Sequence, residues 1–116
     1  MRRIPAWLAI AAGAWTLVAT PLLHAQEGNV VRVGVIGPFT GPSSDFGKPM
    51  LQGIELAVEE INAVGGYVGR PLQLVIKDDR GDPQTGLQAS QELASQGVVA
   101  TIGFCNTGVA QKSLDV

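Results

Sequence analysis

The chain has 116 residues, with 8 Lys+Arg against 10 Asp+Glu, one His and one Cys, and 46% of its residues are apolar. The low basic content argues against a nucleic-acid binder, because few side chains would neutralise a phosphate backbone. The apolar fraction is high enough to build a core, which argues against a disordered chain. A single cysteine, Cys105, excludes an internal disulfide framework.

The first 25 residues have the pattern of an export signal. Met1-Arg2-Arg3 supplies a short positive start, and residues 4–23 carry no charge. A small residue then precedes the predicted cleavage between Ala25 and Gln26. An uncleaved membrane anchor is the alternative, since about 20 apolar residues can span a bilayer. The glycine, proline and many alanines of this stretch favour cleavage. We therefore expect residues 26–116 to work outside the cytoplasm.

The rest of the chain alternates predicted strands and helices. Residues 30–36 form a β-branched run bounded by Gly37-Pro38, which predicts a buried strand. From Lys48 to Val64, apolar residues recur at helical spacing, with Pro49 expected in the first turn. Gly65-Gly66 is predicted to end this helix, because glycine accepts the left-handed cap conformation.

Two further strand and helix pairs follow. Residues 72–77 read as the second strand, and Asp82-Pro83 supplies an N-cap and a first helical residue for the second helix. Gly97 is its predicted stop. Residues 98–102 form the third predicted strand, and a third helix begins near Thr107. This alternation predicts the α/β class, an open parallel sheet with flanking helices and right-handed crossovers.

Ligands of open parallel sheets bind at the carboxyl ends of the strands. Three predicted loops lie there: Gly37–Gly47, Asp78–Asp82 and Gly103–Gly108. The first is long for a turn from strand to helix, which favours a binding role. Its glycines do not fit the dinucleotide fingerprint G-x-G-x-x-G, so a nicotinamide enzyme has little support.

The loops contain several candidate functional residues. Phe46 is either a wall of a ligand pocket or a cap on the core. Asn106 and Thr107 lie at a helix start, where they either receive a ligand carboxylate or simply cap the helix. Asp78-Asp79 is predicted to cap a loop rather than to bind a metal. Cys105 is predicted to be a buried structural thiol, because no His follows the export signal to activate it.

The combined motifs resemble the start of the periplasmic branched-chain amino acid binding proteins, the type I substrate-binding components of ABC importers. These are exported proteins whose two α/β lobes close on a ligand around a hinge. The motifs cover the chain from about Val30. They are residues 33–42 (VGVIGPFTGP), Phe46-Gly47, Gly53-Ile54-Glu55-Leu56-Ala57, residues 60–69, Asp78-Asp79 with Asp82-Pro83, and Ile102-Gly103.

The resemblance implies a periplasmic solute receptor rather than an enzyme. It implies an amino acid or amide ligand, a membrane permease as partner, and no cofactor, metal or nucleic acid. In the family, the start of the helix after the third strand grips the ligand carboxylate, which corresponds to Asn106 and Thr107. The aromatic residue before the glycine of the first loop lines the side-chain pocket, which corresponds to Phe46.

Two departures from the family pattern qualify this expectation. Leucine-binding relatives usually carry serines in the third loop, where this chain has Phe104-Cys105-Asn106-Thr107-Gly108. Ligand identity therefore stays open, because the family also takes up amides, urea and aromatic acids. Family members are also several times longer. We therefore expect residues 26–116 to be a truncated first lobe, without the second lobe, with little or no affinity of its own.

Two other classes of function remain open. The same fold serves as the ligand-sensing lobe of receptors and of amide-responsive regulators, although an export signal favours import. An enzyme of the flavodoxin or nucleotide-binding type has the least support. Such an enzyme would need a histidine, a phosphate loop or a metal cluster, and residues 26–116 offer none of these patterns.

Overall fold

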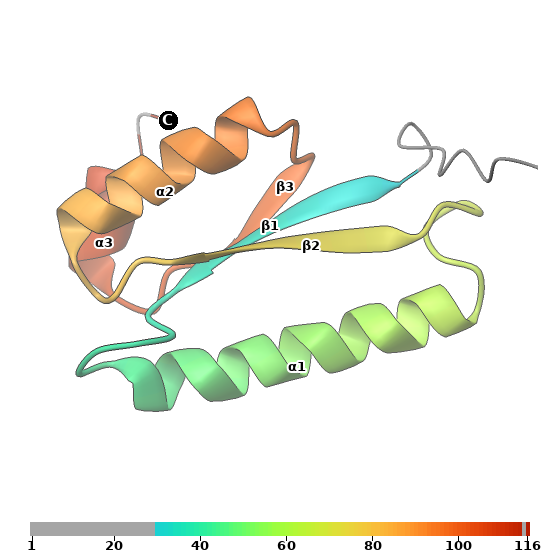
Figure 1. Ribbon diagram of the computed structural model, residues 1–116, viewed down its shortest axis with the longest axis horizontal. Helices are drawn as coiled ribbons and strands as arrows, with labels where there is room; N and C mark the ends of the chain where they lie inside the picture. Colours follow the sequence, from blue (N-terminus) through green and yellow to red (C-terminus); the bar gives the residue numbers. More distant parts are fainter. Residues whose placement is uncertain (1–29, 115) are drawn as a thin grey trace, which may run out of the picture.

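A computed structural model describes residues 30–114 and 116. The predicted signal peptide, residues 1–25, and its cleavage point lie outside the described residues. Strand and helix alternate three times along the described chain (Figure 1). The elements are β1 (Val31–Gly37), α1 (Ser44–Ala63), β2 (Leu72–Asp78), α2 (Pro83–Ser95), β3 (Ala100–Gly103) and α3 (Thr107–Lys112).

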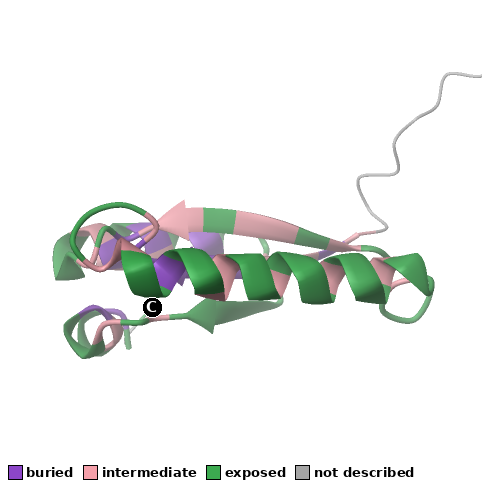
Figure 2. Ribbon diagram, turned by 90° about the horizontal axis from the view of Figure 1, so that it is seen from below, coloured by how far each residue is buried: buried purple, intermediate pink, exposed green. Residues whose placement is uncertain are grey.

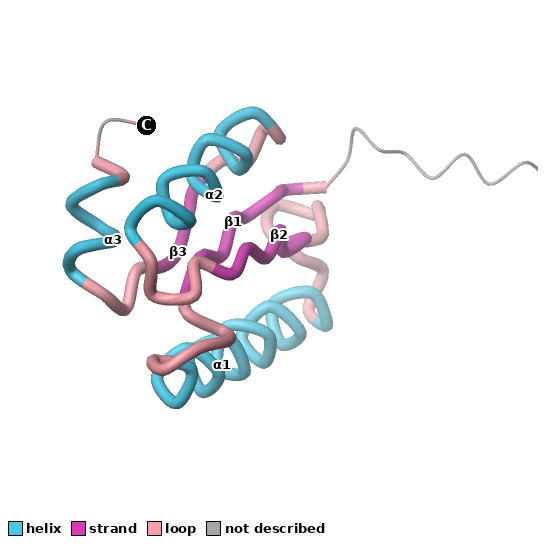
Figure 3. The backbone as a smooth tube through the Cα atoms, turned by 60° about the vertical axis from the view of Figure 1, so that its left-hand side comes forward, coloured by secondary structure: helices cyan, strands magenta, loops and turns pink. Residues whose placement is uncertain are grey.

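The three strands form one parallel sheet in the order β2-β1-β3. Val35 on the central strand lies opposite Ile76 of β2 and Ile102 of β3. Helix α1 covers one face of the sheet, and α2 and α3 lie on the other (Figures 1 and 3). The predicted α/β class, with a parallel sheet and flanking helices, is confirmed.

The core lies between α2 and the sheet. Ile36, Ala89 and Leu93 are buried there, with Val75, Val98 and Phe104 packed around them. Val109 of α3 is also fully buried, and a Cβ at Gly86 would lie 2.2 Å from its Cγ1. The absence of a side chain at Gly86 therefore lets α2 and α3 approach closely.

Helix α1 packs more loosely than α2. Gly47 is its one buried residue, and most of its surface is exposed (Figure 2). Its far end is tied to the start of β2 by Asn62, whose amide donates to the carbonyl of Leu72 at 2.9 Å and accepts from its N–H at 2.7 Å. None of the helices in the described part of the chain has the length and hydropathy that a membrane crossing requires.

The predicted start of the first helix was wrong. Helix α1 begins at Ser44, so Pro49 lies inside it rather than in its first turn. The first loop is therefore residues 38–43, an ordinary length for a connection in an α/β unit. Apolar periodicity begins only at Met50, because Asp45 and Phe46 in the first turn are exposed and Gly47 packs against the main chain of Pro38. The length of the first loop therefore does not indicate a binding role.

Candidate functional site

Three loops meet at the carboxyl edge of the sheet. Strands β1, β2 and β3 end at Gly37, Asp78 and Gly103, and because they are parallel their following loops gather at one end (Figure 3). This is the edge at which an open α/β sheet binds its ligand.

Asp78 ties the first loop to the end of β2. Its Oδ1 accepts hydrogen bonds from the main-chain N–H groups of Phe39 at 2.9 Å and Thr40 at 3.3 Å. Its Oδ2 accepts from the Thr40 hydroxyl, and Oδ1 also accepts from the N–H of Arg80 at 3.0 Å. Partial burial raises the pKa of Asp78, but these hydrogen bonds outweigh it, so the pKa lies below its ordinary value.

Asp79, the next residue after Asp78, is fully buried. Its Oδ1 accepts from the N–H of Gly81 at 2.7 Å, whereas its Oδ2 has no hydrogen-bond partner among the described residues. Burial raises the pKa of Asp79 and the charge of Asp78 adds to this, while the Gly81 hydrogen bond partly opposes it. The predicted loop-capping role of Asp78-Asp79 is confirmed. In residues 30–114 and 116, no three His, Cys, Asp or Glu side chains gather as they would around a metal ion.

Phe46 lies in the first turn of α1, on the side of the first loop. Its side chain is 74% exposed, so it is not a cap on the core. The following residue, Gly47, is buried, and a Cβ there would lie 2.2 Å from the carbonyl oxygen of Pro38. This close approach fixes the start of α1 against the first loop and so places Phe46 at the carboxyl edge of the sheet.

Asn106 is the N-cap residue of α3, but its side chain makes no capping hydrogen bond. Its Nδ2 instead donates to Oγ of Ser43 at 3.3 Å, and its Oδ1 is buried without a partner among the described residues. Thr107 is exposed. The main-chain N–H groups of Thr107 and Gly108, and the Thr107 hydroxyl, make no hydrogen bond to any described residue.

Ser43 was missed as a candidate by the sequence analysis. Serine is common in turns, so its position in the first loop predicts only a turn residue. The order of the strands in the sheet is the observation that places Ser43 near the site. Strands β1 and β3 are neighbours in the sheet, so the residues that precede α1 and α3 meet at the same edge.

The prediction that Cys105 is a buried structural thiol was wrong. Cys105 is exposed, and its Sγ lies 3.7 Å from Sδ of Met50 in α1. Partial burial raises the pKa of this thiol, and the charge of Asp79 adds to the effect. The short loop after β3 leaves the thiol at the surface, although cysteine as a residue type favours burial.

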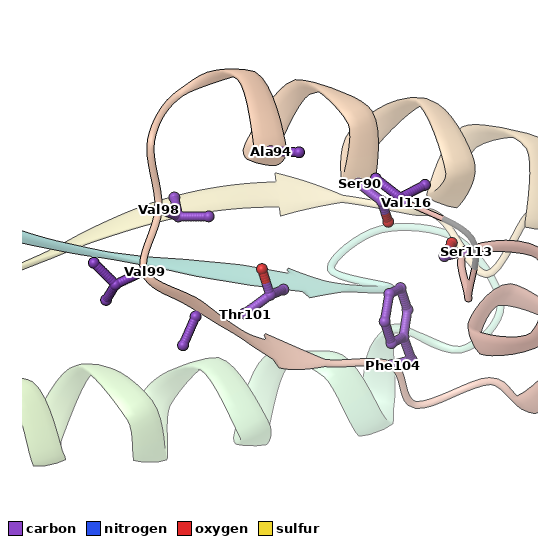
Figure 4. Close-up of a pocket in the computed structure, with 9 residues that line it drawn as sticks. Ser90, Ala94, Val98, Val99, Thr101, Phe104, Ser113 and Val116 are labelled. Carbon is purple, nitrogen blue, oxygen red and sulfur yellow. The ribbon is translucent and has the colours of Figure 1, made fainter.

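Two largely apolar hollows lie on either side of β3. The first, about 300 Å³, lies between α2, β3 and α3 (Figure 4). The second, about 360 Å³, lies between α1 and the sheet. Val98 and Phe104 line the first hollow, and Ile54 of α1 lines the second. The candidate site is the carboxyl edge of the sheet, where the loops after β1, β2 and β3 meet. We call it the loop edge.

Similarity to known proteins identifies the family. A family model described as periplasmic binding protein matches residues 30–116, which is the whole described part of the chain. The chain belongs to the periplasmic binding protein family. Members of this family are substrate-binding proteins rather than enzymes. The predicted resemblance to the branched-chain amino acid binding proteins is confirmed by the relatives below.

Two curated relatives and one solved structure show which members of the family this chain is similar to. The Leu/Ile/Val-binding protein homolog 3 of Brucella melitensis is 40% identical over 86 residues, covering 74% of this chain and 23% of the relative. The Leu/Ile/Val-binding protein BraC3 of Rhizobium johnstonii is 36% identical over 105 residues, covering 87% and 28%. The substrate-binding protein LivJ of Streptococcus pneumoniae, solved with isoleucine, has a TM-score of 0.72 and 26% identity over 74% of this chain and 25% of its own. The chain therefore spans about a quarter of the length of these relatives.

Proposed function

We propose that this chain is the first part of an exported solute-binding component of an ABC importer, with a branched-chain amino acid or a related amide as ligand. The observation that carries the proposal is the loop edge itself. The first N–H groups of α3 have no partner there among the described residues, and they lie in the same cluster of loops as the exposed Phe46. The names of the relatives support the ligand class, since LivJ was solved with isoleucine.

The proposed roles follow from the chemistry of each residue. Thr107 offers a hydroxyl and a main-chain N–H, which suit a ligand carboxylate. Phe46 offers apolar surface to the ligand side chain, and its burial on binding would contribute to affinity. Asn106, the N-cap residue of α3, is proposed to contribute to the same carboxylate site together with Thr107. We propose the periplasm as location and a membrane permease as partner, in line with the family.

Isothermal titration calorimetry of the full-length gene product tests this proposal. L-leucine, L-isoleucine and L-valine are the first probes, followed by short aliphatic amides and urea. Thr107→Val removes the proposed hydroxyl donor and should weaken binding about tenfold, the size of one hydrogen bond to a charged group. Gln111→Ala, an exposed change on the same helix, is the matched control and should leave the Kd unchanged. Equal affinities of Thr107→Val and the unmodified protein would contradict the proposed role.

A further inference from the structure

The side chains of Ser43 and Asn106, at the N-cap positions of two helices, hydrogen-bond to each other and not to their own helices. Ser43 precedes α1 and Asn106 precedes α3. At such positions, serine and asparagine usually accept a hydrogen bond from an N–H two or three residues later, which stabilises the helix start. Neither side chain does so here. Asn106 donates to the Ser43 hydroxyl instead, at 3.3 Å between Nδ2 and Oγ.

The loop after β2 lies against the same pair of side chains. Gly81 has a φ of +73°, and a Cβ on it would lie 3.5 Å from Oγ of Ser43 and 3.6 Å from Oδ1 of Asn106. The loops after β1, β2 and β3 therefore meet at one point. Because Oδ1 is buried without a partner, the bond to Ser43 is the one hydrogen bond of the Asn106 side chain among the described residues.

Helix α3 is short, so few contacts determine where it begins. Its six residues are anchored on one side by Val109, which is fully buried against Gly86. On the other side, the N-cap residue is held by the contact with Ser43. Without that contact, the Asn106 side chain would lose its one hydrogen bond among the described residues, and the main chain at Thr107 would lose a fixed neighbour.

We propose that Ser43 is a positioning residue of the ligand site. It holds the Asn106 amide, and through it the main-chain turn that presents Thr107 to the ligand. The inference rests on the proposed function, because it concerns the same site. It adds a residue of the first loop to a site otherwise assigned to the third loop and to Phe46.

The test compares two adjacent serines in the full-length gene product. Ser43→Ala removes the acceptor of the Asn106 amide, and we expect the Kd for L-leucine to rise about fivefold, the effect of one lost hydrogen bond. Ser43→Thr keeps the hydroxyl and should restore wild-type affinity. Ser44→Ala is the matched control, since the Ser44 hydroxyl makes no hydrogen bond to another described residue, and its Kd should stay unchanged.

A double variant separates positioning from a general loss of stability. If Ser43 acts through Asn106, Ser43→Ala should weaken binding in the wild-type background but not in an Asn106→Ala background. An additive loss in the double variant would overturn the proposal. So would equal losses in Ser43→Ala and Ser43→Thr, because the hydroxyl would then have no role.

A measurement on the ligand-free protein keeps this inference apart from the proposed function. In a two-dimensional NMR spectrum, the side-chain NH₂ resonances of Asn106 should move in Ser43→Ala and stay in place in Ser44→Ala. If the wild-type protein binds neither L-leucine nor another amino acid or amide, the proposed function fails, and the NMR comparison alone decides on the contact. Unmoved Asn106 resonances in Ser43→Ala would overturn the positioning role.

Discussion

The same substitution at two glycines of α1 should have opposite effects. A Cβ on Gly47 would lie 2.2 Å from the carbonyl oxygen of Pro38, a main-chain atom that cannot give way without moving the loop. A Cβ on Gly53 would meet nothing within 4 Å. Gly47→Ala should therefore lower the free energy of unfolding by about 1–3 kcal/mol through overpacking. Gly53→Ala should raise it by about 0.5–1 kcal/mol, because alanine favours a helix interior.

Urea unfolding of the 116-residue chain and its two variants measures both changes. The pair controls for the chemistry of the substitution, since the helix and the added methyl group are the same. A loss of stability in Gly53→Ala, or none in Gly47→Ala, would contradict the packing described for the start of α1.

The residues of the site show where sequence reasoning ends. The loop-capping role of Asp78 could be predicted in part, because an acidic residue at a strand end has a local partner in the N–H two residues later, here that of Arg80. Its bonds to Phe39 and Thr40 cross 39 and 38 residues and depend on the strand order. The exposure of Cys105 could not, because it depends on which side chains of α1 reach the loop after β3. The contact of Ser43 with Asn106 joins residues 63 positions apart, which only the strand order brings to the same edge of the sheet.

At the scale of elements, apolar runs, helical spacing and turn or cap residues together located the three strands and three helices of the described chain. Apolar spacing gave the existence and type of α1, and the cap residues Asp82 and Gly97 marked α2, with Thr85 donating to Asp82 as expected. Boundaries failed where polar residues enter a helix, as at Ser44, or where a strand begins late. Strand β3 begins at Ala100 rather than residue 98, because pairing with β1 starts only at Val33 opposite Ala100.

The two long helices should differ in local stability. Helix α2 buries Leu93, Ala89 and Gly86, whereas α1 buries only Gly47. Local opening of a helix costs less when fewer apolar groups leave the core. In the 116-residue chain, central amides of α1 should therefore exchange with deuterium about tenfold or more faster than central amides of α2.

Hydrogen exchange followed by NMR or mass spectrometry measures this difference directly. The amides of β1 serve as an internal reference, since Val35 and Ile36 are fully buried. Equal protection of α1 and α2 would show that the loosely packed face of α1 is covered in solution, and would contradict the expectation.

At the scale of the whole molecule, adjacent carboxylates give the free energy of unfolding two opposite dependences on pH. The pKa of Asp78 is lowered in the folded state, so its contribution is present above the unfolded value of 3.8 and is lost as pH falls through the folded pKa. The pKa of Asp79 is raised, so ionising it in the folded state costs free energy. That cost grows as pH rises from 3.8 through the folded pKa.

Two asparagine variants separate these contributions. Asp78→Asn should be about 1–3 kcal/mol less stable than the wild-type chain at pH 7, because hydrogen bonds to a charged acceptor are lost. This deficit should shrink as the wild-type Asp78 is protonated below pH 3.8.

Asp79→Asn should show the reverse trend, since its stability relative to wild type should increase as pH rises from 3.8 towards 7. Urea unfolding at half-unit steps between pH 2.5 and 7 measures both trends, and parallel curves for the three proteins would contradict them. The two carboxylates are neighbours in sequence and differ only in burial and partners. Opposite slopes of stability against pH in the two variants would therefore assign both pH dependences to the end of β2 and the loop after it, at the edge of the sheet that holds the proposed ligand site.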